Sequence, residues 1–183
     1  MQSTSKLVPV MLLMLPLLAA TTPARGDFND GVLALMQGRN EEALKTLLPL
    51  AETSNHAYAQ YFVGRMYAEG RGVPQNREEA AKWFRKAAEK GVQDAQFRLG
   101  GMYERGEGVP TDMEYAFAWY SVSAHIGNPK AAAALESASA RMSAEERRSA
   151  NTLAADLIQK YGNVPESTSK GVGAAMTPGV PAR

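Results

Sequence analysis

Three pairs of adjacent glutamates come closest to a catalytic arrangement in this sequence: Glu41 with Glu42, Glu78 with Glu79, and Glu145 with Glu146. Two neighbouring carboxyl groups can act as general acid and general base, but one of them then needs an apolar pocket that raises its pKa. Each pair falls instead in the first turn of a predicted helix, where negative charge is favoured by about 0.3–1 kcal/mol. The pairs are predicted to stabilise helix starts, so an envelope hydrolase is disfavoured and the chain is predicted not to be an enzyme.

Histidine, cysteine and glycine-rich motifs give no cofactor or metal site. The chain has no Cys, which excludes disulfides, thiolate metal ligands and a Cys nucleophile. Its two histidines, His56 and His125, lie far apart in the sequence, and His125 falls in the last turn of a predicted helix. The segments Gly70–Gly72 and Gly106–Gly108 resemble half of a nucleotide-binding fingerprint, but each follows a predicted helix rather than a strand. They are interpreted as loop glycines.

Length and charge describe one ordinary globular domain. The chain has 183 residues, 45% of them hydrophobic, and 20 Lys and Arg against 19 Asp and Glu. A net charge of +1 gives no basic field for a phosphate backbone, and the aromatic residues are too few and too spread for base stacking. Nucleic acid is therefore excluded as the expected partner.

Residues 1–26 have the layout of a secretory signal. Lys6 precedes an apolar run from Leu7 to Ala20, and small residues stand at the two positions that signal peptidase reads before Asp27. The run contains two prolines and is shorter than the roughly 20 residues that cross a bilayer, so no permanent membrane span is predicted. We expect cleavage after Gly26, with a cut near Ala20 and an uncleaved anchor as alternatives, and a periplasmic mature protein.

A 36-residue repeat organises the middle of the chain. Residues 59–94 and 95–130 align with fourteen identities, which indicates that one supersecondary unit is used at least twice. The identical pairs are Ala59/Ala95, Gln60/Gln96, Gly64/Gly100, Met66/Met102, Tyr67/Tyr103, Gly70/Gly106, Gly72/Gly108, Val73/Val109, Pro74/Pro110, Glu78/Glu114, Ala80/Ala116, Trp83/Trp119, Ala88/Ala124 and Gly91/Gly127.

Each unit reads as two amphipathic helices joined by a loop. Apolar and small residues recur at helical spacing from Ala59 to Tyr67 and again from Ala80 to Ala88, and the loop between them carries Gly-x-Gly-Val-Pro. Asn76 and Asp112 are predicted N-caps of the second helices. A glycine inside a helix costs about 1 kcal/mol, so Gly64 and its counterpart Gly100 predict that another helix approaches closely there. The recurring Trp83 and Trp119 are predicted core residues.

The flanking segments read as partial copies of the same unit. Helices are expected from about Phe28 to Gln37 and on to about Thr53, then over Pro129 to Met142, and finally from a capping box at Ser143 to about Lys160. A terminal helix with a polar outer face is what a solenoid needs at its end. Residues 27–161 therefore form the predicted helical repeat domain, and the Gly-, Pro- and Ser-rich residues 162–183 a disordered tail.

The repeat resembles the Sel1-like repeat, a relative of the tetratricopeptide repeat with a longer loop in each hairpin. The resemblance is carried by Ala-x-x-x-Val-Gly-x-x-Tyr from Ala59, by Gly-x-Gly-Val-Pro, and by Ala-x-x-Trp-Phe-x-Lys-Ala-Ala-x-x-Gly from Ala80. It covers about Phe28 to Tyr161, and the second copy departs from it at Ser121 to Ser123. The resemblance implies an all-α fold: a right-handed α-α solenoid of about three and a half stacked helical hairpins.

The resemblance also implies a function. Proteins of this kind bind another protein or peptide in a concave groove lined by the first helices, without chemistry or cofactors of their own, and exported members act as envelope adaptors or regulators. Exposed end faces also allow weak homodimers. The alternative is a binder of peptidoglycan or exopolysaccharide, with Tyr61 and Phe97 stacking on sugar rings. Comparison with tetratricopeptide positions predicts these groove residues: Tyr61, Arg65, Glu69, Phe97, Glu104 and Arg105.

Overall fold

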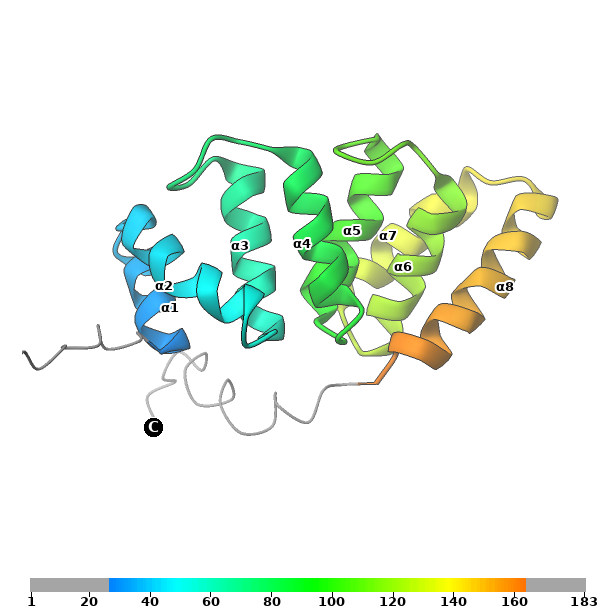
Figure 1. Cartoon of the computed structure of the whole chain (residues 1–183). Coiled ribbons are helices and arrows are strands. Elements are labelled where there is room, and N and C mark those ends of the chain that lie inside the picture. The colour runs from blue at the N-terminus through cyan, green and yellow to red at the C-terminus, as the bar shows by residue number, and fades with distance from the viewer. Residues whose placement is uncertain (1–26, 164–183) are drawn as a thin grey trace, which may run out of the picture.

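The computed structural model describes residues 27–163, and the predicted signal segment and residues 164–183 of the predicted tail lie outside this part. The described part is built of eight α-helices joined by turns and loops, so the predicted all-α fold is confirmed (Figure 1). The helices are α1 (Phe28–Met36), α2 (Asn40–Glu52), α3 (Ala57–Glu69), α4 (Arg77–Ala88), α5 (Gln93–Arg105), α6 (Met113–His125), α7 (Pro129–Ala140) and α8 (Ala144–Tyr161).

Consecutive helices pack as antiparallel pairs that stack along one axis. α1 pairs with α2, α3 with α4 and α5 with α6, and the pairs join through the α2–α3 and α4–α5 contacts. The stack therefore runs from α1 at one end of the molecule to α8 at the other (Figure 1). This arrangement is an α-solenoid whose two central pairs are the two copies of the 36-residue repeat.

Polar caps and glycines set the ends of the repeat helices as predicted. The Asn76 and Asp112 side chains accept hydrogen bonds from the backbone N–H groups of Glu79 and Tyr115, each at 3.0 Å. The first helices end at Gly70 and Gly106 in the left-handed conformation, with φ of 68° and 66°. Because only glycine adopts this conformation without strain, each first helix stops there and the chain turns into the loop.

The helices of each repeat cross closely at the two predicted glycines. A Cβ atom on Gly64 would lie 3.0 Å from the Phe84 ring, and one on Gly100 would lie 2.7 Å from the Tyr120 ring. The close approach predicted from the sequence is thus confirmed. The ring that covers each glycine belongs to the residue after the repeated tryptophan.

The long loop of each repeat packs on the preceding helix pair. A Cβ on Gly72 would lie 2.7 Å from the Asn40 backbone, where α2 begins, and one on Gly108 would lie 2.2 Å from the carbonyl oxygen of Arg77, where α4 begins. No side chain fits at either position. The second glycine of each loop therefore sets how closely one pair stacks on the next.

The two repeated tryptophans are buried as predicted but have different neighbours. Trp83 is 7% exposed, and the Lys86 ammonium lies 4.1 Å from its ring centroid. Trp119 is 3% exposed and stacks on Tyr161 of α8, with 5.7 Å between ring centroids. The difference arises because the second repeat lies next to the terminal helix.

The C-terminal end closes with a helix that packs on the second repeat. α8 begins with the predicted capping box, in which Ser143 and Glu146 bond each other's backbone N–H groups. It packs against α6, and Met142, Ala150 and Ala154 form a small core with Phe117 and Ala118. Within residues 27–163, none of the helices is long and apolar enough to cross a membrane.

Candidate functional site

The candidate site is a groove on the side of the first helices, α3 and α5. Side chains spaced by three and four residues lie on one helical face, so Phe62, Arg65 and Glu69 follow one another along α3. Their counterparts 36 residues later on α5 are Arg98, Gly101 and Arg105. All six residues line one of two pockets, and these two pockets together are called the groove below.

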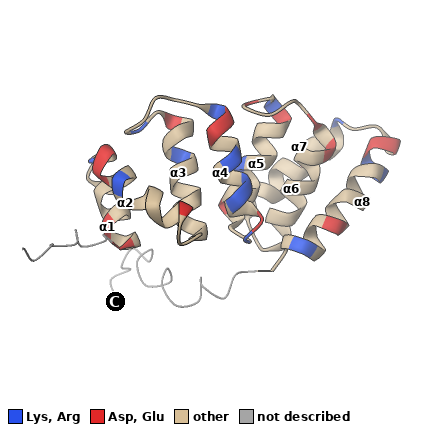
Figure 2. Ribbon diagram, in the orientation of Figure 1, with Lys and Arg blue, Asp and Glu red and all other residues tan. Residues whose placement is uncertain are grey.

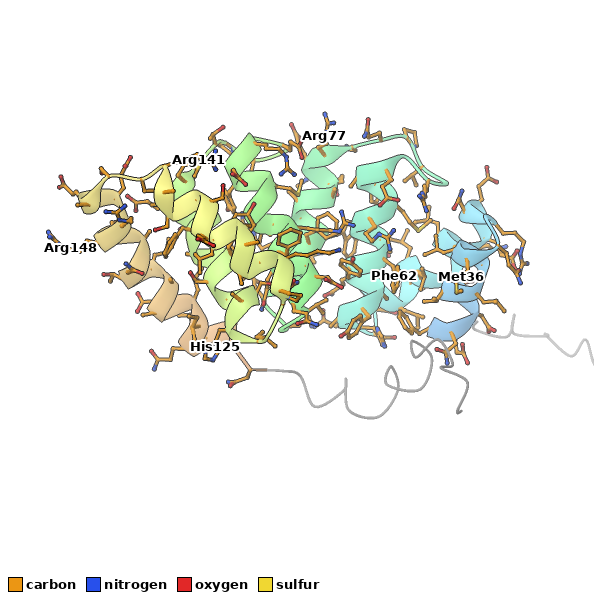
Figure 3. The ribbon with its side chains drawn as sticks, turned by 180° about the vertical axis from the view of Figure 1, so that it is seen from behind. Met36, Phe62, Arg77, His125, Arg141 and Arg148 are labelled. Carbon is orange, nitrogen blue, oxygen red and sulfur yellow. The ribbon has the colours of Figure 1, made fainter. Side chains whose placement is uncertain are left out.

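The first pocket lies between α1 and α3 and has a volume of about 170 Å³. Met36 at the end of α1 is 81% exposed, and it is seen with Phe62 on the rear face of the molecule (Figure 3). Most side chains that line this α1–α3 pocket are apolar, and the charged ones are Arg65, Glu69 and Arg71. Its lining residues are Val32, Leu35, Met36, Phe62, Arg65, Met66, Glu69 and Arg71.

The second pocket is centred on α5 and has a volume of about 270 Å³. It shares Glu69 with the α1–α3 pocket, so the two pockets adjoin at this residue. This α5 pocket mixes aromatic rings with charged side chains. Its lining residues are Ala68, Glu69, Arg77, Phe84, Phe97, Arg98, Gly101, Met102, Arg105, Glu107 and Tyr120.

Aromatic side chains and one carboxylate fix the wall of the α5 pocket. The rings of Phe97 and Tyr120 lie 5.7 Å apart, and the Tyr120 hydroxyl donates to Glu104 at 2.6 Å. Burial, together with this bond to a carboxylate, raises the pKa of Tyr120. The hydroxyl therefore stays protonated, and the Tyr120 side chain carries no charge.

Charged groups in the groove are paired except at two positions, the exposed Arg77 and the half-buried Arg98. Glu69 pairs with Arg65 at 3.3 Å and with Arg71 at 2.9 Å, and Arg105 pairs with Glu107 at 3.1 Å. The guanidinium of Arg98 lies 5.9 Å from the Phe84 ring centroid and forms no ion pair with any described residue. Both signs of charge are otherwise mixed along the ribbon (Figure 2).

Four of the six predicted groove residues line the groove, namely Arg65, Glu69, Phe97 and Arg105. Tyr61 lines neither pocket, because this side chain is only 8% exposed and its ring packs against Phe84. Phe62, the next residue, takes its place in the α1–α3 pocket.

Glu104 also lines neither pocket. Its carboxylate accepts a hydrogen bond from Tyr120 and pairs with Arg141 after α7. Glu104 therefore joins three helical elements and is occupied by intramolecular partners.

Of the six groove residues related by the repeat, the sequence prediction missed three: Phe62, Arg98 and Gly101. A signal for them was present, because Phe62 stands three residues before Arg65 and so shares its helical face. Applying the repeat length of 36 to Phe62 and Arg65 leads directly to Arg98 and Gly101.

Residues considered for chemistry have structural roles in the described part. The three glutamate pairs lie in the first turns of α2, α4 and α8, as predicted. His125 lies in the last turn of α6 as predicted, and His56 caps α3. No group of three or more potential metal ligands occurs among residues 27–163.

Stacked helical pairs with a groove along the first helices define a tetratricopeptide-like α-solenoid. Residues 57–92 and 93–128 each match the Sel1 repeat, so the chain contains two tandem Sel1 repeats. These repeats generally mediate protein interactions, and their fold is typically a non-catalytic scaffold. A search of curated protein sequences gives no match.

Solved Sel1-type structures resemble the chain along most of its length. A protective antigen of uropathogenic Escherichia coli that displays an SLR fold is 27% identical, with a TM-score of 0.70 over 86% of this chain and 36% of its own. A Sel1 repeat protein from Oxalobacter formigenes is 28% identical, with a TM-score of 0.60 over 72% of this chain and 56% of its own. The chain thus spans about a third and about half of the lengths of these proteins.

Proposed function

We propose that this chain is an exported, non-catalytic adaptor or regulator of the cell envelope that holds a protein or peptide partner in the groove. The observation that carries the proposal is the pair of adjoining pockets on the first helices of consecutive Sel1 repeats. Half-buried aromatic and arginine side chains line these pockets, and such residues dominate the binding energy of protein interfaces.

In-cell cross-linking tests the groove. A photo-reactive amino acid replaces Phe62, and cross-linked proteins are identified by mass spectrometry. The combined variant Arg65→Glu and Arg105→Glu should remove these adducts, because it reverses two charges at the groove edge. Lys45→Glu, on the exposed side of α2 outside both pockets, is the matched charge reversal and should leave them unchanged. Adducts that survive equally in both variants would contradict the proposal.

Export is the second part of the proposal. It is supported by the signal-like layout of residues 1–26. N-terminal sequencing of the protein from cells should find Asp27 as the first residue. An intact Met1 would overturn export by a cleaved signal.

The polymer-binding alternative loses one of its two supports. Stacking on sugars needs an accessible ring face, and Tyr61 is buried against Phe62 and Phe84. We expect the purified protein to remain in the supernatant when peptidoglycan or exopolysaccharide is sedimented. Co-sedimentation would favour the polymer over a peptide.

A further inference from the structure

We propose that the partner segment is acidic: a carboxylate side chain binds Arg98 and Arg105 in the α5 pocket, and a neighbouring apolar side chain enters the α1–α3 pocket. This inference rests on the proposed function, because it specifies what the groove binds. It follows from the excess of arginine in the groove, from the glycine at position 101 of the second repeat, and from the composition of residues 1–26 and 164–183.

The groove carries an excess of positively charged side chains. Five arginines but only two glutamates line the two pockets: Arg65, Arg71, Arg77, Arg98 and Arg105 against Glu69 and Glu107. The chain as a whole is close to neutral, with a net charge of +1. Positive charge is thus concentrated in the groove, and a carboxylate entering it gains attraction that few intramolecular acids compete for.

Arg98 is the centre of this excess. Its side chain is half-buried, held beside the Phe84 ring, and unpaired among the described residues. A guanidinium presents several N–H donors in a fixed fork that matches a carboxylate. Since burial makes an unpaired charge costly, a bound carboxylate would supply the partner that Arg98 lacks.

Gly101 lets donor groups of the α5 pocket lie close to the helix backbone. The first repeat carries Arg65 at this position, whereas the second carries glycine. A Cβ on Gly101 would lie 3.0 Å from Nη1 of Arg105 and 3.4 Å from the Tyr120 hydroxyl oxygen. Any side chain here would occupy the space beside these donors. The glycine therefore lets the Arg105 guanidinium and the Tyr120 hydroxyl lie directly over the α5 backbone, where Gly101 and Arg98 both line the pocket.

The apolar half of the ligand follows from the other pocket. Leu35, Met36 and Phe62 line the α1–α3 pocket, and Met36 leaves a large apolar side chain 81% exposed. Because Glu69 belongs to both pockets, one short peptide segment can fill them together. A Met-containing apolar pocket adapts to either aliphatic or aromatic side chains.

The chain's own terminal segments do not have this chemistry. Residues 1–26 contain Lys6 and Arg25 but no acidic residue, and residues 164–183 contain one acid, Glu166, with two basic residues. Neither segment is acidic, so the occupant is a segment of another protein.

Selection from a random displayed-peptide library on the immobilised purified protein tests the inference. Enriched peptides should carry Asp or Glu next to an aromatic or aliphatic residue. The best of them, labelled and followed by fluorescence anisotropy, should bind about ten-fold more weakly when its acids are changed to amides, and more weakly at high salt.

Two groove variants and one control complete the test. Arg98→Gln and Gly101→Arg should each weaken binding of that peptide about ten-fold or more, the first by removing the cation and the second by displacing the Arg105 guanidinium that lies against Gly101. Arg148→Gln, an exposed arginine on α8, should bind normally (Figure 3). Melting temperatures of all variants are measured in parallel to show that each is folded. If Gly101→Arg is unstable, the loss of peptide binding in Arg98→Gln alone tests the acidic ligand.

The outcomes separate this inference from the proposed function. Neutral or basic peptides that still lose binding in the combined variant Arg65→Glu and Arg105→Glu would overturn the acidic ligand and keep the groove. Failure to enrich any peptide would count against peptide binding itself and remove both. Binding of polygalacturonate without any enriched peptide would assign the arginines to an anionic polymer and overturn the inference.

Discussion

His56 shows how much one side chain can contribute at a helix start. Its Nδ1 accepts the backbone N–H of Ala59 at 3.1 Å, and its ring stacks on Phe28 with 4.6 Å between centroids. Burial lowers the pKa of His56 below the ordinary value of 6.5. The cap also needs the neutral ring, since a protonated Nδ1 cannot accept a hydrogen bond. One imidazole therefore joins α1 to α3, and its capping hydrogen bond requires the uncharged form of the ring.

We expect acid to destabilise the fold through His56. Because its pKa is lower in the folded than in the unfolded chain, its contribution is complete above pH 6.5 and is lost as the pH falls below that value. Urea unfolding at several pH values between 7.5 and 5 measures the effect. His56→Asn retains an N-cap without this titration, so its stability should fall less over the same interval.

His56→Ala serves as the structural control for this experiment. It should lose about 1 kcal/mol of unfolding free energy at pH 7.5, because the N-cap is removed. Equal acid sensitivity in the wild type and in His56→Asn would refute the role assigned to the imidazole.

The repeated tryptophans should each be essential for stability. Truncating a large buried aromatic side chain leaves a cavity, so Trp83→Ala or Trp119→Ala should cost about 3–5 kcal/mol. Chemical unfolding followed by circular dichroism measures the loss. A cost below about 1 kcal/mol for either variant would show that its pocket collapses without penalty.

At the scale of elements, the loop of each repeat sets the stacking of the helix pairs. Gly108 has a φ of 72°, and a Cβ there would collide with the backbone of Arg77. Gly38 has a similar φ of 74°, but nothing lies within 4 Å of its Cβ position. A substitution at Gly38 therefore introduces backbone strain alone, whereas one at Gly108 introduces the same strain and also disrupts the close contact with α4.

Replacing the two glycines by alanine should give different losses. Gly38→Ala should cost about 1–2 kcal/mol, the strain of a left-handed alanine. Gly108→Ala carries the same strain and must also push α4 away from the loop, so its loss should be clearly larger. Calorimetric unfolding of both variants checks the order. Equal losses would mean that the loop and α4 separate at no cost.

The sequence predicted the elements well because their signals are local. Caps such as Asn76, the helix-ending glycines and the repeat spacing act within a few residues of where they stand. The groove was predicted less well, because Tyr61 and Phe62 are adjacent aromatic residues and the packing of Phe84 decides which one is buried. The docking of α8 on α6 likewise depends on contacts far apart in the sequence.

At the scale of the whole molecule, buried glutamines link each helix pair to the one before it. Nε2 of Gln60 donates to the carbonyl oxygen of Ala51, and Nε2 of Gln96 donates to that of Ala88, both at 3.0 Å. Gln96 also donates to the carbonyl oxygen of Tyr161 at 3.1 Å. The last helix is thereby connected to the second repeat by a hydrogen bond as well as by packing.

The terminal helix α8 should therefore be required for the fold, whereas residues 164–183 should not. A chain ending after Met142 loses Tyr161 from the face of Trp119 and loses the apolar contacts of α8 with Phe117. A solenoid unit without its capping helix exposes its core, so this variant should be insoluble or unfold at a much lower temperature. A chain ending after Asn163 keeps every one of these contacts. It should melt within about 2 °C of the full chain, because changes that leave the buried contacts in place rarely exceed about 0.5 kcal/mol. If both truncated chains had the same melting temperature, α8 would not contribute to stability, and the two Sel1 repeats would be stable without a closing helix.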